Sequence, residues 1–454
     1  MVQSLHVSEK EGMERIEELR RRGVRKVRLQ YSDLHGIARG KVVPLDELEH
    51  LVHHGIGFVG AVMTMDLRHN VILGLETGLP DVQARPDLST LTQLPWDPEA
   101  AWCIADLREM ASGKPFNLDS RHVLRQVVKR FESIGLFPVV GPELEFYLCE
   151  KDPEARGGIK RYMDKDSNVY TTGIFAEPQG VLEYMLENCL AFGLEAYAAN
   201  HEYGRSQFEI NMRHTQALTA ADRTFLFKTL IKELAYRKGL HATFMGKPWN
   251  DDEGSGTHFH FSFRNEQGAN VLYDPSREDQ VSDIGKHFIA GVLNKVPALM
   301  AIMCPTVNAY RRINAQGLVP TRINWGYDNR FTLIRIPNER EAATRIEVRV
   351  ADGTANPYLA AAAILAAGLE GIEEKMEPPK AVEGFLYALS EEEQGPPLPT
   401  SLEEALTYLE KDEALRAYLG DELVDTFVTI KRAEITRFNQ WVTDWELREY
   451  AHHL

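Results

Sequence analysis

Acidic side chains alternate with apolar ones in a short stretch near residue 145. In residues 141–148, Glu143 and Glu145 are separated by Leu144 and followed by Phe146 and Leu148. Side chains of a β-strand alternate between its two faces, so the two carboxylates would share one face. Neighbouring carboxylates raise each other's pKa unless a cation neutralises them, and hard divalent cations prefer carboxylate oxygens. The stretch therefore predicts a metal-binding strand with an apolar back.

The same alternation recurs in residues 207–212, 257–263 and 345–350. The polar residues that would share a face are Gln207, Glu209, Asn211, His258, His260, Ser262, Arg345, Glu347 and Arg349. Carboxylates with one or two histidines favour Mg²⁺ or Mn²⁺ over zinc, which prefers sulfur and nitrogen ligands. Arginines in the same place indicate an anionic ligand, either a phosphate or a carboxylate. Together these strands predict one sheet with a buried side and a magnesium-type site that handles phosphoryl groups.

The elements expected around these strands are helices and loops of two domains. We predict a boundary between residues 114 and 115, which gives domains 1–114 and 115–454. Helical spacing of apolar residues predicts helices at 120–135, 181–192 and 225–239, and an alanine-rich buried helix at 356–376. Asp119 or Ser120 would cap the first of them. Residues 251–256 would form an acidic loop directly before the His258 strand.

The composition is that of a globular protein. The chain has 454 residues, 44% of them apolar, and a net charge of −16. This acidic balance argues against a nucleic-acid partner. The first residues lack the apolar core of a signal peptide, and the most apolar run, 358–369, is too short to span a bilayer. Four scattered cysteines without CxxC spacing predict reduced thiols. We therefore expect a cytoplasmic protein without a membrane partner.

Six ordered segments identify a family resemblance that extends over almost the whole chain. GPELEFYL, NHEYGRSQFEI, GSGTHFHFSF, NAYRR, NRFTLIRIP and RIEVRVADGTANPYL resemble the signature segments of type I glutamine synthetases. The resemblance implies an α+β fold, with a small N-terminal β-grasp domain and a large catalytic domain. The catalytic domain would contain a curved antiparallel sheet flanked by helices. It also implies a dodecamer of two stacked six-membered rings with active sites between neighbouring subunits.

The resemblance assigns a role to each matching residue. Two or more Mg²⁺ or Mn²⁺ ions would be held, the first by Glu145, Glu202 and Glu209 and the second by Glu143, His258 and Glu347. Glutamate would contact Gly254, Arg312 and Arg349. Arg330 and Arg335 would face the transferred phosphate of ATP, while Arg345, His260 and Ser262 would contact the nucleotide. Asp33 would be the acid that the N-terminal domain of a neighbour contributes at the amine site.

The implied chemistry is the activation of a carboxylate by ATP. The γ-carboxylate of glutamate would attack the terminal phosphorus, and an amine would then displace phosphate from the resulting γ-glutamyl phosphate. Because amines are mostly protonated at neutral pH, a carboxylate must hold the cation and accept its proton. Asp33, Arg330 and Arg312 are the predicted catalytic residues.

The chain departs from the family pattern at the flap that closes the ammonium pocket. Leu318 stands where the family has a glutamate, and leucine cannot hold ammonium or accept its proton. An apolar side chain there would suit an alkyl substituent, so we expect a γ-glutamylamine ligase that acts on a small primary amine. Methylamine, an alkylamine or ethanolamine would fit better than a polyamine. Glu253 is a second departure, because the family usually has asparagine beside the glutamate.

Two other functions are compatible with the sequence. Glu253 could replace the missing flap acid in a plain glutamine synthetase that uses ammonia. A non-catalytic, regulatory relative would keep the fold as a scaffold, although no predicted metal ligand is lost. Tyr387 stands where some bacterial members are adenylylated, and an exposed tyrosine without a regulatory role is an equal alternative.

Overall fold

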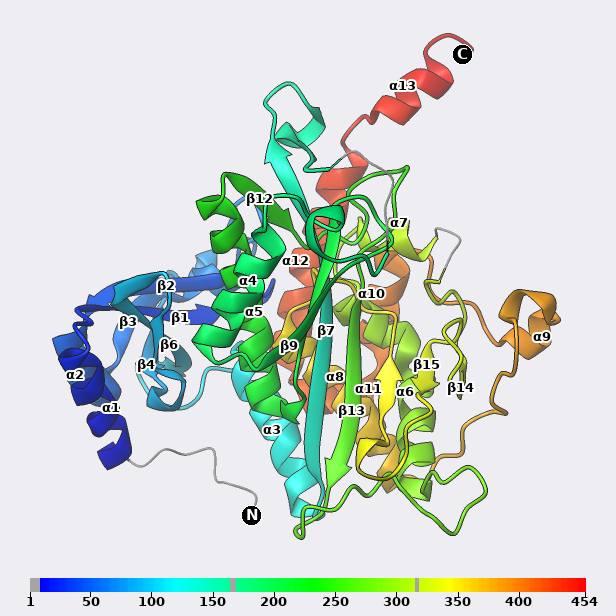
Figure 1. Ribbon diagram of the computed structural model, residues 1–454, viewed down its shortest axis with the longest axis horizontal. Helices are drawn as coiled ribbons and strands as arrows, with labels where there is room; N and C mark the ends of the chain where they lie inside the picture. The colour runs from blue at the N-terminus through cyan, green and yellow to red at the C-terminus, as the bar shows by residue number, and fades with distance from the viewer. Residues whose placement is uncertain (1–8, 164–168, 315–317) are drawn as a thin grey trace.

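The N-terminal domain is built on a six-stranded mixed sheet. The computed structural model describes residues 9–163, 169–314 and 318–454 (Figure 1). Strands β2, β1, β6, β4 and β3 lie side by side in this order, β5 pairs with β6, and β1 runs parallel to β6. The bounds are β1 (Lys26–Ser32), β2 (Ala38–Pro44), β3 (Ile56–Val59), β4 (Asp81–Pro86), β5 (Thr92–Leu94), β6 (Asp97–Glu109), α1 (Glu9–Arg21) and α2 (Leu48–His54).

The catalytic domain contains a ten-stranded sheet centred on the long strand β7 (Phe137–Lys151). Its main order is β14-β15-β16-β13-β7-β10-β9, and β8, β11 and β12 also pair with β7. Every pairing is antiparallel except β14 with β15. The bounds are β8 (Ile159–Arg161), β9 (Ala196–His201), β10 (Gln207–Met212), β11 (Thr215–Gln216), β12 (Leu240–Thr243), β13 (Thr257–Arg264), β14 (Trp325–Tyr327), β15 (Ile334–Ile336) and β16 (Ile346–Val348). The predicted α+β fold, with a small N-terminal domain and a catalytic sheet flanked by helices, is confirmed.

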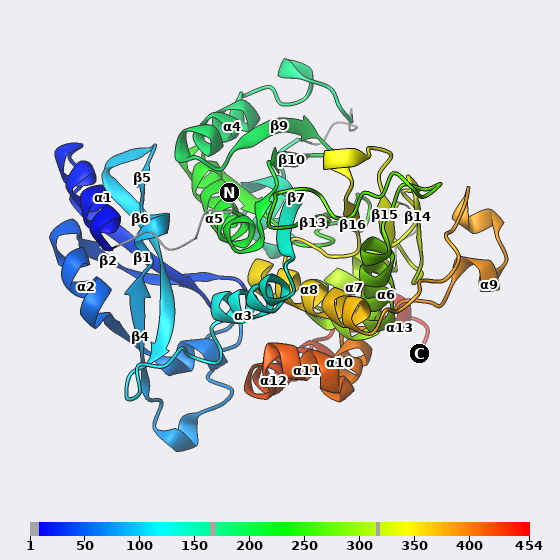
Figure 2. The same cartoon turned by 90° about the horizontal axis from the view of Figure 1, so that it is seen from below.

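Helices cover the apolar side of this sheet in two layers. Figure 2 shows α6 and α8 beside the strands, with α10, α11 and α12 beyond them. The bounds are α3 (Ser120–Ser133), α4 (Val181–Phe192), α5 (Ala217–Arg237), α6 (Asp283–Met303), α7 (Ala309–Ile313), α8 (Pro357–Glu373), α9 (Glu391–Gln394), α10 (Leu402–Lys411), α11 (Glu413–Leu419), α12 (Asp421–Asn439) and α13 (Asp444–Tyr450). Within the described ranges, no helix combines the length and apolarity needed to cross a bilayer.

Small residues let α6 and α8 approach until their backbones touch. A Cβ atom added at Gly291 would lie 2.2 Å from the carbonyl oxygen of Ala367, and one at Gly371 would lie 2.2 Å from that of His287. Side chains larger than hydrogen would therefore force the helices apart. This contact explains why the alanine-rich segment predicted at 356–376 is buried along almost its whole length.

Two capping residues join the domains. The Asp119 side chain accepts a hydrogen bond from the backbone N–H of Arg121 at the start of α3 and another from Leu107 of β6. The Asn356 side chain caps α8 and donates to the backbone oxygen of Asp33 at 2.9 Å. The N-terminal domain is thus fixed to the first turns of two catalytic-domain helices.

Candidate active site

The register of the catalytic sheet collects the polar residues of four strands on one face. Across β7, Glu143 is paired with His258 of β13 and Glu145 with Glu209 of β10. One strand further, His260 of β13 is paired with Glu347 of β16. Because directly paired residues point to the same side of a sheet, the predicted ligands on β7, β10, β13 and β16 lie on a common face.

One end of this face combines two carboxylates with two imidazoles. Ligand atoms of Glu143, His260 and Glu347 all lie within 4.8 Å of one another. Nδ1 of His258 is 3.5 Å from Glu143 and 3.6 Å from Glu347. Nε2 of His260 is 3.1 Å from Glu143. The sequence predicted only His258 as a ligand, and the geometry makes His260 a second candidate.

The other end of the face contains carboxylates whose pKa values are raised by burial and by repulsion from their neighbours. Burial raises the pKa of Glu209 well above its ordinary value, and repulsion by Glu143 and Glu145 raises it further. Burial, followed by repulsion from Glu145, raises the pKa of Glu202 to about 7. Carboxylates that resist ionisation in this way are stabilised when a divalent cation binds between them. The donor set fits Mg²⁺ or Mn²⁺.

Side-chain amides hold three of these carboxylates in place. Nε2 of Gln207 donates to Glu145 at 2.8 Å, Nδ2 of Asn200 donates to Glu202 at 2.7 Å, and Nδ2 of Asn211 donates to Glu209 at 2.8 Å. Hydrogen bonds of this kind orient metal ligands and tune their basicity. Sequence reasoning placed Gln207 and Asn211 on the polar face without assigning them this role. The signal in the sequence was that Gln207 and Asn211 lie two residues before and after Glu209, and therefore on the same face of the strand.

Two buried arginines adjoin the acidic face, and each has a donor without a hydrogen-bond partner among the described residues. Arg312 donates from Nη1 to the Val350 carbonyl at 2.8 Å, and Arg349 donates from Nη1 to Glu347 at 2.6 Å. Both side chains are nearly fully buried, and the Nε atom of each has no partner among the described residues. A Cβ atom added at Gly256 would lie 2.6 Å from Nη2 of Arg312 and 3.4 Å from Oε1 of Glu145. A small anion is the ligand that these donors fit.

The loop that carries Gly254 packs directly on Arg312. A Cβ atom added at Gly254 would lie 2.7 Å from Cγ of Arg312, so only glycine fits there without displacement. Gln207, which holds Glu145, also donates to the Gly254 carbonyl at 3.1 Å. The predicted glutamate-binding residues Gly254, Arg312 and Arg349 therefore adjoin the predicted metal ligands.

The predicted ATP-binding residues lie in three places. His260, Ser262 and Arg345 line, together with Glu143, a cavity of about 220 Å³. Arg335 instead pairs with Glu347 and with Asp328. Arg330 is exposed and lines a separate hollow beside Phe331.

Comparison with known proteins identifies the relationship. The catalytic domain of glutamine synthetase matches residues 117–450, and the N-terminal domain of glutamine synthetase matches residues 10–116. The chain belongs to the glutamine synthetase family. It is an ATP-dependent ligase, and members of this family use divalent metals.

Individual relatives cover nearly the whole chain. Gamma-glutamylputrescine synthetase PuuA of Escherichia coli K12 is 35% identical over 428 residues, which are 92% of this chain and 89% of PuuA. The glutamine synthetase of Thermus thermophilus is 34% identical over 444 residues, which are 95% of this chain and 97% of that protein. The structure of a GmaS/ADP complex aligns with a TM-score of 0.86 at 32% identity, covering 96% of this chain and 99% of GmaS. The family prediction, with γ-glutamylamine ligases among the relatives, is confirmed.

Two predicted amine-site residues have contrasting surroundings. Leu318 is 40% exposed, so its side chain is accessible to a substrate. The carboxylate of Asp33 is buried and accepts hydrogen bonds from His35 N, Ile37 N and Arg39 Nε of its own chain. All three of these donors come from the turn and the strand that follow Asp33 in the N-terminal domain.

Proposed function

We propose that this member of the glutamine synthetase family joins the γ-carboxylate of L-glutamate to a small primary amine at the expense of ATP. Two relatives support the proposal: PuuA is named as a γ-glutamylputrescine synthetase, and the GmaS complex contains ADP. The supporting observation in this chain is the unused Nε donor on each of the buried side chains Arg312 and Arg349. Next to a divalent-metal face, these donors fit the carboxylates of an amino-acid substrate.

The proposed metal ligands are the residues of the acidic face. Glu145, Glu202 and Glu209 would hold one ion, and Glu143, Glu347 and an imidazole, His258 or His260, would hold another. When bound, Mg²⁺ or Mn²⁺ neutralises the charge that develops on the phosphates of ATP. Arg335, Arg345 and Ser262 would position the nucleotide beside this face.

The reaction consists of two transfers. A γ-carboxylate oxygen of glutamate attacks the terminal phosphorus of ATP, and the bond between that phosphorus and the ADP oxygen breaks. The amine nitrogen then attacks the acyl carbon of γ-glutamyl phosphate, its proton passes to a carboxylate, and the carbon–oxygen bond to phosphate breaks. Arg312 and Arg349 would hold the glutamate during both steps.

Leu318 is the residue that we propose selects the amine. A leucine side chain provides no counter-ion for ammonium, whereas contact with one methylene group is worth about 1–3 kcal/mol of discrimination. Methylamine, ethylamine and ethanolamine are therefore expected to be better substrates than ammonium. Putrescine is expected to be poorer, because its second ammonium group would need another acid.

The test is steady-state kinetics with ammonium, methylamine, ethylamine, ethanolamine and putrescine. We expect a primary monoamine to give the highest kcat/KM. Leu318→Glu should raise kcat/KM for ammonium about 10-fold, and Leu318→Gln, which has nearly the same shape without the charge, should not. Ammonium as the best substrate of the unchanged protein would refute the amine assignment. A scaffold protein would hydrolyse no ATP with any amine.

Glutamine synthesis from ammonia is the second candidate function. Glu253 is exposed in the loop that carries Gly254. The Tyr147 hydroxyl group donates a hydrogen bond to the backbone oxygen of Glu253 at 2.7 Å. If this carboxylate replaces the missing flap acid, Glu253→Gln should reduce kcat/KM for ammonium more than for methylamine. Equal loss with both amines would exclude this role of Glu253.

We also propose that the chain assembles into two stacked six-membered rings. Helix α13 projects from the body in Figure 1, and Trp441 and Trp445 near it are 73% and 61% exposed. Exposed tryptophans in a projecting segment are typical of subunit contacts. Light scattering should give about twelve times the chain mass of 51.4 kDa. A monomer that retains full activity would contradict active sites shared between subunits.

A further inference from the structure

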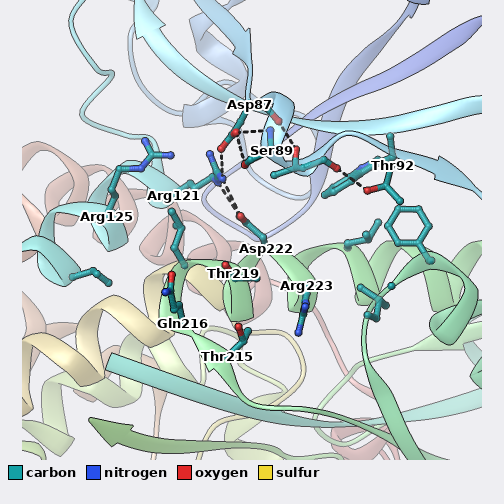
Figure 3. A pocket seen from close by; sticks show the side chains of 18 of the residues that line it. Asp87, Ser89, Thr92, Arg121, Arg125, Thr215, Gln216, Thr219, Asp222 and Arg223 are labelled. Carbon is teal, nitrogen blue, oxygen red and sulfur yellow. Dashed lines mark hydrogen bonds and ion pairs between the residues drawn. The ribbon is translucent and has the colours of Figure 1, made fainter. Parts of the chain in front are cut away.

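A cavity of about 900 Å³ lies between the N-terminal and catalytic domains, away from the residues of the proposed active site. Its N-terminal wall comes from α1, β5, β6 and the turn at Leu88–Thr90. Its catalytic wall comes from α3, α5, β11 and the residues that follow α4. Figure 3 shows the polar side chains of both walls facing each other. A space of this size can contain a small organic molecule.

One end of the cavity presents polar groups that the fold leaves unused. Helix α5 begins here, and its N-cap Gln216 forms no capping hydrogen bond with the first turn. Arg223, one turn beyond Thr219, pairs with Glu195 at 2.8 Å, yet its buried Nη1 atom has no partner in the part of the chain that the structure describes. In Figure 3 no interaction connects Thr215, Gln216, Thr219 or Arg223 to another side chain of the cavity.

The charge of the lining favours an anion. Five cationic side chains line the cavity against three carboxylates, although the whole chain has a net charge of −16. Arg121 is occupied by the aspartates around it. Among the described residues, Arg15 donates to the carbonyls of Leu88 and Ser89. Lys129 is exposed and forms no ion pair with a described residue. Arg15 and Lys129 therefore keep charge for a ligand, and Arg223 keeps a hydrogen-bond donor.

The other end of the cavity is apolar. Trp102 and Phe192 meet edge to face with ring centroids 6.1 Å apart, and Leu194 and Leu226 complete this wall. Both rings are almost fully buried by the protein. An apolar group of a ligand that packs against these rings would remove its own apolar surface from water, which favours binding. The cavity therefore combines a cationic, hydrogen-bonding end with an aromatic end.

We propose that this interdomain cavity is a binding site for a small organic anion with an apolar body. The anionic group, a carboxylate or a phosphate monoester, is bound at the start of α5 by Arg223 and Lys129. The partial positive charge at the N-terminus of a 21-residue helix adds to the attraction. The apolar body contacts Trp102 and Phe192.

The cavity is connected to the active-site face through two paired strands. Phe137 lines the cavity at the start of β7, and Glu143 lies six residues further along that strand. Gln216 of β11 lines the interdomain cavity and pairs with Val139 of β7. His214, two residues before Gln216, lines the smaller cavity beside Glu143. Occupation of the interdomain cavity is thus expected to change the KM for ATP.

The experiment is calorimetric titration of the full chain with four probes. The probes are 3-phenylpropionate, phenyl phosphate, the neutral 3-phenylpropan-1-ol and propionate, which lacks the ring. We expect saturable 1:1 binding of 3-phenylpropionate, of phenyl phosphate or of both, and at least 10-fold weaker binding of the alcohol and of propionate. Which anion binds more tightly identifies the anionic group. No saturable binding up to about 10 mM would overturn the proposal, as would equal binding of the neutral alcohol.

Variants locate the site. Lys129→Gln and Arg223→Gln should each weaken anion binding at least 5-fold. Arg237→Gln removes a matched arginine of the same helix, paired with Glu233 at 3.1 Å outside the cavity, and should leave binding within 2-fold. Thr219→Trp, which places an indole ring at the start of α5 inside the cavity, should weaken binding at least 5-fold while thermal unfolding confirms the fold. If Arg223→Gln and Lys129→Gln bind like the unchanged protein, or if an ATP analogue competes directly with the probe, the site is elsewhere and the proposal fails.

Discussion

Two regions of the molecule each gather several partly or fully buried carboxylates, and the two regions neutralise them differently. Around Arg121, Asp87, Asp106 and Asp222 lie 2.7, 2.6 and 2.8 Å from the guanidinium group. Arg121 and Arg125 outweigh the effect of burial and lower the pKa of Asp106 to about 2, although burial still raises the pKa of Asp222. On the catalytic face, His260 lowers the pKa of Glu143 and Arg349 lowers that of Glu347, whereas burial and mutual repulsion raise the pKa values of Glu202 and Glu209.

The difference separates a structural cluster from a functional one. The aspartates at the domain interface receive their counter-ion from the chain itself, so the cluster is complete when the protein folds. Glu202 and Glu209 of the catalytic face have amide partners and raised pKa values, so we expect an ion from solution to complete that cluster. Neighbouring carboxylates that are held by side-chain amides and raise each other's pKa are therefore the better marker of the site.

The largest expected effect is on activity. Glu209→Gln removes a proposed metal ligand, and kcat/KM for the ligation should fall about 1,000-fold, which is about 4 kcal/mol of transition-state stabilisation. Folding stability without metal should stay the same or rise, because the neutral amide replaces a carboxylate whose pKa is already raised. Steady-state kinetics and thermal unfolding measure the two effects. Lower stability without loss of activity would reverse the assignment of the two clusters.

Arg121→Met should mainly lower folding stability, whereas Glu209→Gln mainly lowers activity. Three aspartates would lose their common counter-ion, and breaking a buried ion pair in this way costs about 3–5 kcal/mol of stability. Denaturant unfolding measures the loss. Arg20→Met, which removes an arginine paired with Glu17 and Asp46 at the surface, is the matched control and should leave the midpoint nearly unchanged. Equal effects of the two substitutions would contradict a structural role of the Arg121 cluster.

The catalytic face should also show a pH-dependent response to metal. Because the folded-state pKa values of Glu202 and Glu209 are above those of the unfolded chain, the metal-free protein should lose stability as the pH rises from about 4.5 through 7. A divalent ion at 100 times its Kd should restore about 2.7 kcal/mol. Its affinity should increase with pH, since binding displaces protons.

Thermal unfolding at pH 5.5, 6.5 and 7.5, with and without MnCl₂ or MgCl₂, measures this response. The stabilisation by the ion should be greatest at pH 7.5, and Glu209→Gln should reduce it. A stabilisation that is the same at every pH would mean that the ion binds outside the acidic face.

Local patterns predicted the strands of the site and much of the helical frame. Alternation placed Glu143 and Glu145 on one face of β7, and the helix predicted at 181–192 has the bounds of α4. Asp119 caps α3 as expected. The helix predicted at 225–239 begins earlier, at Ala217, because Ala220 and Ala221 continue it into the interface with the N-terminal domain.

Features that depend on contacts between distant residues could not be read from these patterns. Alternation puts His258 and His260 on the same face, but only the pairing with β7 and β16 shows that both reach Glu143. Asp33 precedes a turn that contains a glycine, and nothing in that pattern indicates that Arg39 forms an ion pair with the Asp33 carboxylate. The cavity between the domains likewise arises from elements separated by more than a hundred residues.

The smallest predicted effect concerns how the catalytic face is held in place. Gln207 is almost fully buried, its oxygen accepts a hydrogen bond from Gly204 N, and its amide nitrogen links Glu145 to the Gly254 carbonyl. Gln207→Leu keeps the volume but frees both groups. Loss of a partner that orients a metal ligand typically reduces metal affinity or activity about 10- to 100-fold. We therefore expect kcat/KM for glutamate to fall by about that factor.

This substitution can distinguish positioning from general damage. If Gln207 links the two groups, the affinity for Mn²⁺ and the KM for glutamate should worsen together, while the KM for ATP changes less. Gln93→Leu removes a comparable bond, from a glutamine amide to the Pro98 carbonyl in the N-terminal domain, and should change neither value. A Gln207→Leu protein with a lower unfolding temperature but unchanged metal affinity would show that the residue supports only the fold.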